Sequence, residues 1–504
     1  MSSGNVGRAV SDVLDESRAS VERIRSWNSG IVVGRNSLFM VLAQAGGKFA
    51  GLVLFLVLVR SLTIAEIGQF TFALTFVGIF SMLTDWGIST WMMREVARRR
   101  QEASRWLGAG LCAKGFTFAG SAAIGLTVAW ATRLPAGVRN VILILFAAMI
   151  ADVLGQTMAY LFLALERGAI SALVFALTDW LRLGFVCLAL RLTPDLPHVA
   201  WAYLLATCVA PLFCSLCLRR QGLELKRAKR DDLKTALRSG IPFLLVGVFV
   251  RVYLRADTLL LGYLKTDVSV GTYNAAYKLM EALMFIPAAF MGAIFPMLSR
   301  SFGTDMPHFR AGCRMAIRVL SSLGLPLAVG TTLIAPQVIV RLYGPGYGVS
   351  VLYLRILIWA SALIFMNAIL PASLNACGKE KYSLAVLAVG IVLNVVGNVI
   401  LIPGMDATGA AIMTVVTEVV STLLYLLLFR RFLFAPGIPG LIWRPLLASL
   451  LMGGAAYCIL DWPLLAIIVV SVGVYCTCLA AIGGVRRQDL ALGLAVLGMR
   501  SQVL

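Results

Sequence analysis

The stretch "FVRVYLRADTLLLG" (residues 249–262) lies inside a long apolar run and carries three charged residues, Arg251, Arg255 and Asp257. A long apolar run of this kind predicts a membrane-spanning helix, because in lipid the backbone groups must be satisfied within the segment. A charged side chain at the centre of a bilayer costs about 2.5–3.5 kcal/mol, so these residues must face a partner or water. The stretch therefore predicts a membrane protein whose helices enclose a polar interior.

The whole chain has the composition of a polytopic membrane protein, since 60% of its 504 residues are hydrophobic and only 13% are charged. Its N-terminus shows no cleavable signal peptide, and the alternating pattern of a β-barrel is absent. About fourteen runs are long enough to span as helices: 34–59, 69–91, 107–131, 140–164, 168–191, 198–218, 240–263, 272–298, 314–341, 350–376, 382–402, 407–429, 441–460 and 463–485.

Lysine and arginine are concentrated in alternate loops, which sets the orientation in the membrane. The loops on one side hold most of them, whereas the other side holds only Arg60, Arg133, Arg139, Arg191, Lys265 and Arg341. Both termini are therefore predicted in the cytoplasm, with the protein in the cytoplasmic (inner) membrane. The net charge of +20 follows from this bias and from attraction to anionic lipid, and it requires no nucleic acid.

The two halves of the chain repeat each other. "AEIGQFTFAL" (65–74) aligns with "VSVGTYNAAY" (268–277), which pairs Gly68 with Gly271, and the same offset pairs Lys48 with Arg251. With an even number of helices in each unit, both halves enter the membrane from the same side, so the repeat axis runs along the membrane normal. The prediction is two six-helix bundles related by a pseudo-two-fold axis, two extra C-terminal helices, and a central cavity of the alternating-access kind.

This division gives six regions. They are a cytoplasmic or interfacial N-terminal segment, an N-terminal bundle, a basic cytoplasmic linker, a C-terminal bundle, two extra helices and a cytoplasmic tail, at 1–33, 34–218, 219–239, 240–430, 441–485 and 486–504.

Seven basic residues are predicted within spans: Lys48, Lys114, Arg182, Arg251, Arg255, Lys278 and Arg355. Arg251 and Arg255 share one helical face, while Asp257 is about 200° round the helix from Arg255 and cannot pair closely with it. One interpretation is that acids on neighbouring helices neutralise the two arginines. The other is that they form a cationic floor with Lys48, because a guanidinium group binds phosphate bidentately and keeps its charge.

The intramembrane acids divide into two groups. Asp179 with Arg182, and Lys278 with Glu281, are three residues apart and are predicted as structural ion pairs. Asp152 and Glu418 have no evident local partner and, with Asp257, are candidate acids of the cavity or of ion coupling. A stripe of polar residues could line a polar path or could equally serve as contacts between helices: Asn394, Asn398, Thr414, Thr417 and Ser421. Two distant histidines and ten cysteines in apolar surroundings predict neither a metal site nor a disulfide framework.

Three blocks of the chain resemble a known family. "LVRSLTIAEIGQFTFALTF…DWGISTWMMREVARR" (58–99), "DTLLLGYLKTDVSVGTYNAAYKLMEALMFIPAAFMGAIFPMLSR" (257–300) and "LNACGKEKYSLAVLAVGIVLNVVGNVILIPGMDATGAAIMTVVTE" (374–418) are similar, in register, to the polysaccharide flippases. These are the O-antigen-type, lipid-linked oligosaccharide flippases of the multidrug/oligosaccharidyl-lipid/polysaccharide exporter superfamily. The resemblance extends to about residue 430.

The resemblance implies a V-shaped pair of six-helix bundles and a transporter without catalytic residues or a cofactor. Its cargo would be an undecaprenyl-diphosphate-linked oligosaccharide for O-antigen, capsule or exopolysaccharide synthesis, in a pathway with glycosyltransferases and a polymerase. In such families basic cavity residues bind the diphosphate, and Lys48, Arg251 and Arg255 occupy suitable positions. No coupling motif matches residue by residue, so coupling to H⁺ or Na⁺ stays open.

Three alternatives remain. A peptidoglycan-precursor flippase would handle a similar diphosphate. A multidrug cation antiporter of the same superfamily would need an acidic or aromatic cavity, which the basic midplane argues against. A membrane glycosyltransferase or polymerase would need a sizeable site outside the membrane, and the loops are too short for one.

Overall fold

Helices make up the secondary structure of the protein, and no strand occurs in the part of the chain that the computed structural model describes, residues 43–132, 134–223 and 228–484. The predicted all-α class is therefore confirmed. The predicted N-terminal segment 1–33 and tail 486–504 lie outside the described residues, as does Arg133.

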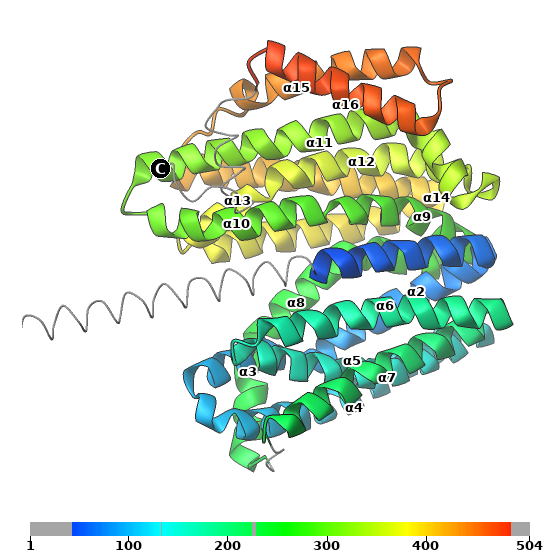
Figure 1. Ribbon diagram of the computed structural model, residues 1–504, viewed down its shortest axis with the longest axis vertical. Helices are drawn as coiled ribbons and strands as arrows, with labels where there is room; N and C mark the ends of the chain where they lie inside the picture. Colours follow the sequence, from blue (N-terminus) through cyan, green and yellow to red (C-terminus); the bar gives the residue numbers. More distant parts are fainter. Residues whose placement is uncertain (1–42, 133, 224–227, 485–504) are drawn as a thin grey trace, which may run out of the picture.

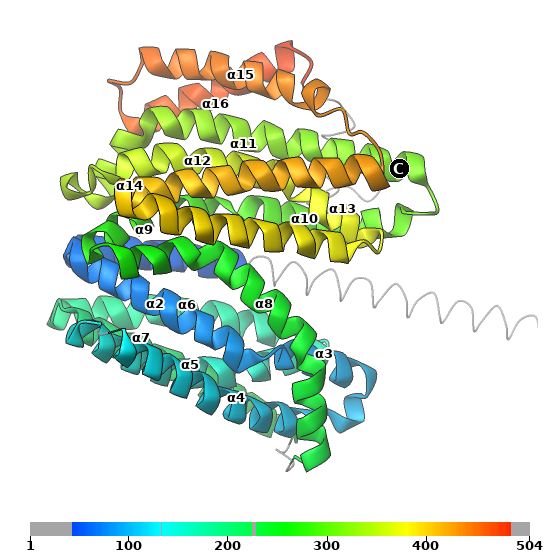
Figure 2. The ribbon, with the colours of Figure 1, turned by 180° about the vertical axis from the view of Figure 1, so that it is seen from behind.

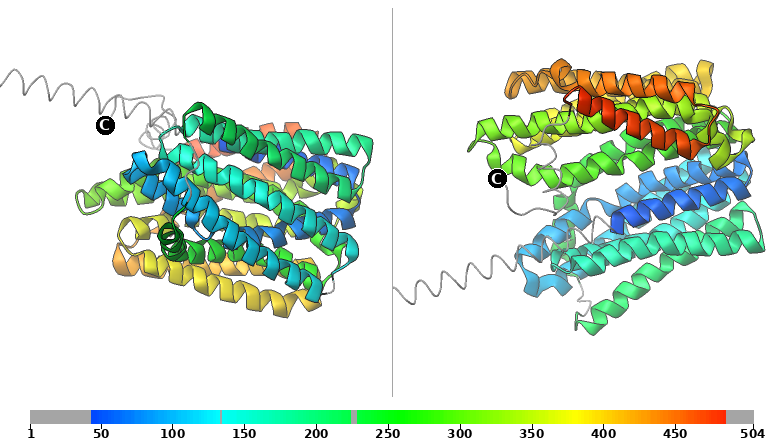
Figure 3. Two further views of the ribbon diagram at one scale, coloured as in Figure 1. Left: turned by 90° about the horizontal axis from the view of Figure 1, so that it is seen from below. Right: turned by 45° about the horizontal axis from the view of Figure 1, so that its top comes forward.

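The helices form two stacked lobes, with a helical hairpin on the outer face of the second (Figure 1). The N-lobe consists of the helix Ala43–Ser61 and of α2 (Ile64–Asp85), α3 (Ile88–Arg98), α4 (Ala103–Ala131), α5 (Ala136–Ala164), α6 (Gly168–Leu192) and α7 (Leu196–Arg220). The C-lobe consists of α9 (Asp267–Leu283), α10 (Phe285–Ser301), α11 (Met306–Tyr343), α12 (Ser350–Asn367), α13 (Ile369–Ala376) and α14 (Glu380–Phe432). The hairpin is α15 (Ile438–Cys458) and α16 (Leu464–Ala481), and Figure 3 shows it from two further directions.

The long helix α8 (Arg230–Leu264) crosses from one lobe to the other (Figure 2). Its first half packs on the N-lobe, where Arg105 donates two hydrogen bonds to Asp232 at 3.0 and 2.8 Å. Its second half packs on α14 and α9 of the C-lobe. The second half of the predicted linker 219–239 is helical, as part of α8. Those residues begin a helix because Asp231 and Asp232 stabilise its first turn.

A helix break explains why α8 can approach the N-lobe so closely. α2 ends at Asp85 with Trp86 as its C-cap, and the next residue, Gly87, has φ = +71°, a value that favours glycine. A Cβ atom at Gly87 would lie 2.4 Å from Cβ of Phe243, and one at Gly240 would lie 2.2 Å from the Trp86 oxygen. Trp86 also donates its indole N–H to the oxygen of Leu237 over 3.0 Å. The two glycines thus let backbone pack on backbone where α8 begins.

The number of helices that could span the membrane differs from the fourteen predicted. Twelve helices in the described part of the chain are long and apolar enough to cross a membrane. α8 is not among them, and α14 counts once although its backbone breaks at Asp406, where φ is 53° and ψ is −142°. A Cβ atom at Gly409 would lie 2.9 Å from the oxygen of Leu401, so the chain turns back on itself there (Figure 2). The count of fourteen stays a prediction.

The repeat seen in the sequence has a counterpart where the lobes meet. A Cβ atom at Gly68 in α2 would lie 1.8 Å from the backbone oxygen of Asp267, and one at Gly271 in α9 would lie 2.3 Å from that of Ile64. Ile64 and Asp267 are related by the same offset as the two glycines. The two contacts are therefore reciprocal, as a pseudo-two-fold axis between the lobes requires.

Further cross-lobe hydrogen bonds lie at the same end of the molecule. Gln69 donates to Asp267 over 2.9 Å, and Arg60 donates to the oxygens of Leu342, at 2.9 Å, and of Arg341. In the predicted orientation this end faces away from the cytoplasm. The lobes are therefore closed against each other at the end where α2 and α9 begin.

Candidate substrate cavity

A cavity of about 290 Å³ lies between the lobes. Its walls come from the helix Ala43–Ser61, α2, α6 and α7 on one side and from α8 and α9 on the other. Its charged lining residues are four basic groups and one acid: Arg182, Arg251, Arg255, Lys278 and Asp179. The cavity is therefore cationic, as far as the described residues line it.

Arg255 is neutralised by the neighbouring helix. Its guanidinium group forms an ion pair with Glu281 of α9 at 2.6 Å and lies over the ring of Tyr277, 5.2 Å from the centroid. Lys278 contacts the second oxygen of the same carboxylate at 3.0 Å. The predicted pair of Lys278 and Glu281 thus exists, but Glu281 also serves Arg255. For Arg255 the first of the two interpretations holds, since a carboxylate of another helix balances it.

Arg251 is different. Its Nε donates to the backbone oxygen of Gly78 in α2 over 3.2 Å, and among the described residues no carboxylate lies within 4.0 Å of its guanidinium group. The side chain is part-buried, one helical turn from Arg255, and both line the cavity. A guanidinium group has five N–H donors, so Arg251 keeps donors for an anion within the cavity. Of the two arginines, Arg251 therefore fits the second interpretation, in which a guanidinium group without a carboxylate partner binds a phosphate.

On the opposite wall, Arg182 of α6 is held between two acids. Asp152 of α5 accepts from it with both oxygens at 2.7 Å, and Asp179 contacts it at 3.4 Å. Tyr203 lies beneath the guanidinium group, with 4.4 Å to the ring centroid. The predicted pair of Asp179 and Arg182 is present, but Asp152 is not isolated. Sequence spacing could not reveal this partner because it belongs to a different helix.

The other predicted site residues lie beside the cavity rather than in it. Lys48 is exposed and does not line the cavity, although it interacts electrostatically with Asp179 and Glu281. Asp257 is buried behind the cavity wall and accepts hydrogen bonds from the hydroxyl of Tyr273 and, over 3.0 Å, from the N–H of Thr258. Of the predicted cationic floor, only Arg251 and Arg255 reach the cavity.

Glu418 is the centre of a separate polar cluster in the C-lobe. It is buried, with 6% of its surface exposed, and accepts from the hydroxyl of Tyr253 in α8 over 2.5 Å and from Asn367 over 3.4 Å. Buried oxygens of Asn367 and of Thr417, the chain neighbour of Glu418, have no hydrogen-bond partner. No lysine or arginine in the described residues forms an ion pair with Glu418. The cluster therefore combines one carboxylate with unsatisfied oxygen atoms.

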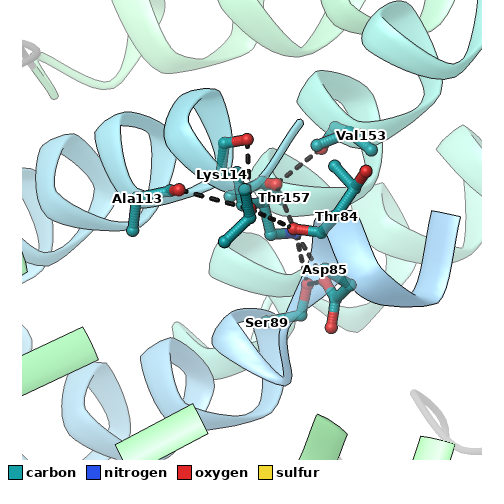
Figure 4. A network of polar contacts seen from close by, with 8 residues as sticks. Thr84, Asp85, Ser89, Ala113, Lys114, Val153 and Thr157 are labelled. Carbon is teal, nitrogen blue, oxygen red and sulfur yellow. Dashed lines mark hydrogen bonds and ion pairs between the residues drawn. The ribbon is translucent and has the colours of Figure 1, made fainter. Parts of the chain in front are cut away.

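A buried network of polar contacts around Lys114, away from the cavity, holds helices of the N-lobe together (Figure 4). Lys114 has only 2% of its surface exposed and contacts Asp85 at 2.7 Å, Ser89 at 2.7 Å and Thr157 at 2.8 Å. Asp85 is the last residue of α2 and also accepts from the Ser89 hydroxyl over 2.6 Å. The network therefore holds α4 and α5 against the break between α2 and α3. This explains why the stretch "DWGIS" (85–89) carries Asp85 and Ser89, the two residues that bind Lys114.

The cavity also includes residues that the sequence did not single out. Tyr203 lies under the guanidinium group of Arg182, and Tyr277 lies under that of Arg255. Gly78 gives Arg251 its backbone contact, and a Cβ atom added at Gly78 would lie 3.3 Å from Nη2 of Arg251. The sequence holds a weak signal for Tyr277, because it belongs to the repeat block together with Asn274, and both residues line the cavity. For Gly78 there is none, because a helical glycine within an apolar run carries no information about a distant arginine.

The two-lobed fold and the polar cavity between the lobes define a membrane transporter. The fold is similar to that of the lipid II flippase MurJ in an inward closed conformation, with a TM-score of 0.73, 12% sequence identity and coverage of 90% of this chain and 100% of MurJ. The sequence model of the family "Polysaccharide biosynthesis protein" matches residues 33–302, and that of the MatE family matches residues 242–400. The chain belongs to the polysaccharide biosynthesis protein family, and the resemblance drawn from its sequence is confirmed.

Known relatives match parts of the chain. AglR of Haloferax volcanii, described as a flippase, is 27% identical over 172 residues, which are 33% of this chain and 36% of AglR. A Shigella dysenteriae protein described as an O-antigen transporter is 26% identical over 196 residues, which are 39% of this chain and 49% of that protein. The matches thus span between about a third and a half of the length of these relatives.

Proposed function

We propose that the protein flips a polyprenyl-diphosphate-linked oligosaccharide from the inner to the outer leaflet of the cytoplasmic membrane, for the synthesis of a polysaccharide such as O-antigen, capsule or exopolysaccharide. The observation that carries the proposal is the free side of Arg251, which faces a cationic cavity and has no carboxylate partner among the described residues. Relatives named as flippases and as an O-antigen transporter support this class of cargo.

The diphosphate would bind between Arg251 and the groups around it. Arg255 and Lys278 share Glu281, so two cations there are balanced by one acid. This leaves positive charge beside Arg251 that an anion can neutralise, and charge-assisted bonds of this kind are the strong ones. Lys48, which lies near Asp179 and Glu281, would add a further charge at the edge of the site.

The size of the cavity fits the diphosphate but not a whole glycan. A space of about 290 Å³ is at the lower end of small-molecule sites. The lobes must therefore move apart to admit the sugars, while the polyprenyl tail stays in lipid. We expect the reciprocal contact of Gly68 and Gly271 to open when the transporter faces outward, and the lobes to rock about α8.

The membrane potential favours export. A diphosphate diester carries roughly two negative charges, and moving each across 100 mV, inside negative, releases about 2.3 kcal/mol. The field alone can therefore drive part of the reaction. A coupled ion is compatible with this but is not required by it.

If an ion is coupled, Glu418 is the acid that we propose for it. Asp152 is paired with Arg182, and Asp257 is satisfied by Tyr273, whereas Glu418 adjoins buried oxygens without partners. A proton on Glu418 or a Na⁺ ion among these oxygens would complete the cluster. Transport in proteoliposomes with only a pH gradient or only a Na⁺ gradient, with wild type and Glu418→Gln, separates these possibilities from an uncoupled flippase.

The proposal is tested by complementation of strains that each lack one flippase for a lipid-linked oligosaccharide. Arg251→Ala should abolish surface polysaccharide while the amount of protein in the membrane stays normal. Arg355→Ala is the matched control, because Arg355 is also an arginine within a span but is exposed and bonded to the oxygen of Thr332 at 3.0 Å. Loss of abundance in step with loss of function would assign Arg251 to structure instead of cargo.

Two rivals have distinct outcomes. A peptidoglycan-precursor flippase would rescue growth after depletion of the cell's own precursor flippase, and its diphosphate would suit the same arginines. A multidrug antiporter would move ethidium out of cells, but four basic groups and one acid around the cavity disfavour an organic cation.

A further inference from the structure

A second, smaller cavity lies at one end of the C-terminal hairpin. Its lining residues are different from those of the cavity between the lobes. The second cavity has a volume of about 70 Å³ and is lined by Arg318 of α11, by Gly440, Leu441, Arg444 and Pro445 of α15, and by Gly484 after α16. Three separate elements therefore converge on it. Two of its six lining residues are arginines, and none is acidic.

Arg444 has a donor in this region that nothing in the described structure satisfies. Its terminal nitrogen donates to the backbone oxygen of Gly483 over 2.6 Å, but its Nε is buried and has no hydrogen-bond partner. No carboxylate among the described residues forms an ion pair with it. A buried charged donor without an acceptor costs free energy, so the geometry points to an acceptor from outside the described residues.

The cavity lies where the hairpin meets water. Gly440 and Arg444 are in the first two turns of α15, and Gly484 follows the end of α16, so the cavity lies at one end of two helices that are long and apolar enough to span a membrane. Trp443, beside Arg444, is 47% exposed, and its ring lies 5.3 Å from the guanidinium carbon. Tryptophan with arginine is typical of the headgroup region of a bilayer. The predicted orientation makes this the cytoplasmic leaflet.

A line of arginines leads to the cavity along α11. Arg310, Arg314 and Arg318 are spaced four residues apart and so share one face. Phe434 lies in the connection between α14 and α15. The guanidinium carbons of Arg310 and Arg314 are 5.7 and 5.6 Å from the centroid of its ring. Neither forms an ion pair within the described residues. This face is therefore strongly positive where lipid headgroups would surround it.

We propose that the cavity binds the phosphate group of an anionic phospholipid, with Arg444 and Arg318 as its ligands and the acyl chains lying along α11 and α15. Phosphate offers several acceptor oxygens, which match the donors of two guanidinium groups. The cavity has room for a group of a few heavy atoms, and a headgroup phosphate is of that size. Basic pockets between helices on the cytoplasmic side are the kind of site that anionic lipids occupy.

Such a lipid would connect the hairpin to the C-lobe. α15 and α16 make their helix contacts with α11 and with each other, so the hairpin is attached on one side only. A phosphate between Arg318 of α11 and Arg444 of α15 would bridge the two elements. The site is independent of the cargo cavity, and it survives if the proposed cargo is wrong.

The test uses the full-length protein, purified in neutral detergent and stripped of lipid. Native mass spectrometry counts bound phosphatidylglycerol, and a thermal melt measures the stabilisation that it gives. The comparison ligands all contain phosphate but differ from phosphatidylglycerol in one respect each: phosphatidylcholine has no net charge, inorganic phosphate has no acyl chains, and undecaprenyl phosphate has a polyprenyl chain and no glycerol. The variants are Arg444→Gln, Gly440→Glu and, as a matched control, Arg430→Gln, which removes an exposed arginine at the end of α14.

The expected result is one tightly held phosphatidylglycerol in the wild type and in Arg430→Gln, with an affinity about tenfold or more lower in Arg444→Gln. Gly440→Glu should weaken binding in the same way, because no heavy atom lies within 4 Å of its Cβ position and the added carboxylate repels phosphate. It replaces Arg444→Gln if that variant does not fold. Equal binding by wild type and both cavity variants overturns the proposal. Preference for inorganic phosphate or undecaprenyl phosphate overturns the lipid as the source.

Discussion

Arg251 of α8 donates a hydrogen bond of 3.2 Å to the backbone oxygen of Gly78 in α2, whereas Arg255, one turn further along, pairs with Glu281 at 2.6 Å. The two arginines therefore face opposite lobes although they share one helix. α8 contacts both lobes near this pair as well, since Tyr253 donates to Glu418 of α14 and Tyr263 packs on Phe72 of α2 with 5.4 Å between the ring centroids.

Arg251→Lys should lower flipping about tenfold or more while leaving the protein folded. Lysine keeps the charge but loses the planar set of donors that holds a phosphate and the Gly78 oxygen at once. The measurement is the rate of flipping of a lipid-linked oligosaccharide in proteoliposomes, compared with the same preparation of Arg355→Lys. A rate equal to the wild type would show that charge alone suffices.

Glu281→Gln should destabilise the protein by about 1–3 kcal/mol, because it leaves Arg255 and Lys278 without their shared carboxylate. The side chains of Arg255 and Glu281 are 21% and 23% exposed, which keeps the loss below that of a fully buried pair. A denaturant melt in detergent measures it. In the double variant Glu281→Gln/Arg255→Gln part of the stability should return, and an additive loss would contradict the pairing.

Gly68→Ala and Gly271→Ala should each prevent the lobes from closing at the α2–α9 end. A methyl group at either position would lie within 2.3 Å of a backbone oxygen on the other lobe, so the helices must separate. Cysteines at Gln69 and Asp267, now joined by a 2.9 Å hydrogen bond, report this as loss of disulfide cross-linking. Gly184→Ala is the control, since nothing lies within 4 Å of its Cβ position. Unchanged cross-linking in both glycine variants would refute the close contact.

Asp85→Asn should destabilise the N-lobe by about 3 kcal/mol or more, because Lys114 would then be a buried charge without a counter-ion. Lys114→Met alone should cost less, as Asp85 is part-exposed and still accepts from Ser89. The double variant Asp85→Asn/Lys114→Met should be more stable than Asp85→Asn. Thermal melts of the purified proteins rank the three, and a double variant below both singles would argue against the ion pair.

The sequence was sufficient for the class of fold and for two of the cavity residues. Apolar length identified helices, and the repeat indicated two lobes with a cavity between them, because both signals are local or periodic. Arg251 and Arg255 could be chosen since a charge in an apolar run must have a reason. The partners of these charges could not be predicted, because Glu281 and Gly78 lie on other helices and their distances depend on packing.

Asp152 illustrates the same limit in the other direction. No basic residue lies one turn away from it in the sequence, which predicts a candidate coupling acid, yet α5 and α6 bring Arg182 to 2.7 Å. Lys48 matches Arg251 in the repeat, yet it is exposed and lies beside the cavity instead of lining it. Equivalence in a repeat fixes the place of a residue on the backbone, while rotation of the helix decides where its side chain ends.

The reciprocal contact of the two glycines has a consequence for how such a chain can arise. Because Gly68 meets Asp267 as Gly271 meets Ile64, a polypeptide of half the length could associate with a second copy of itself through the same surface. Joining two such genes would preserve that homodimer within one chain. Each copy would then be free to diverge, so that one half could supply an arginine and the other a lysine at matching positions.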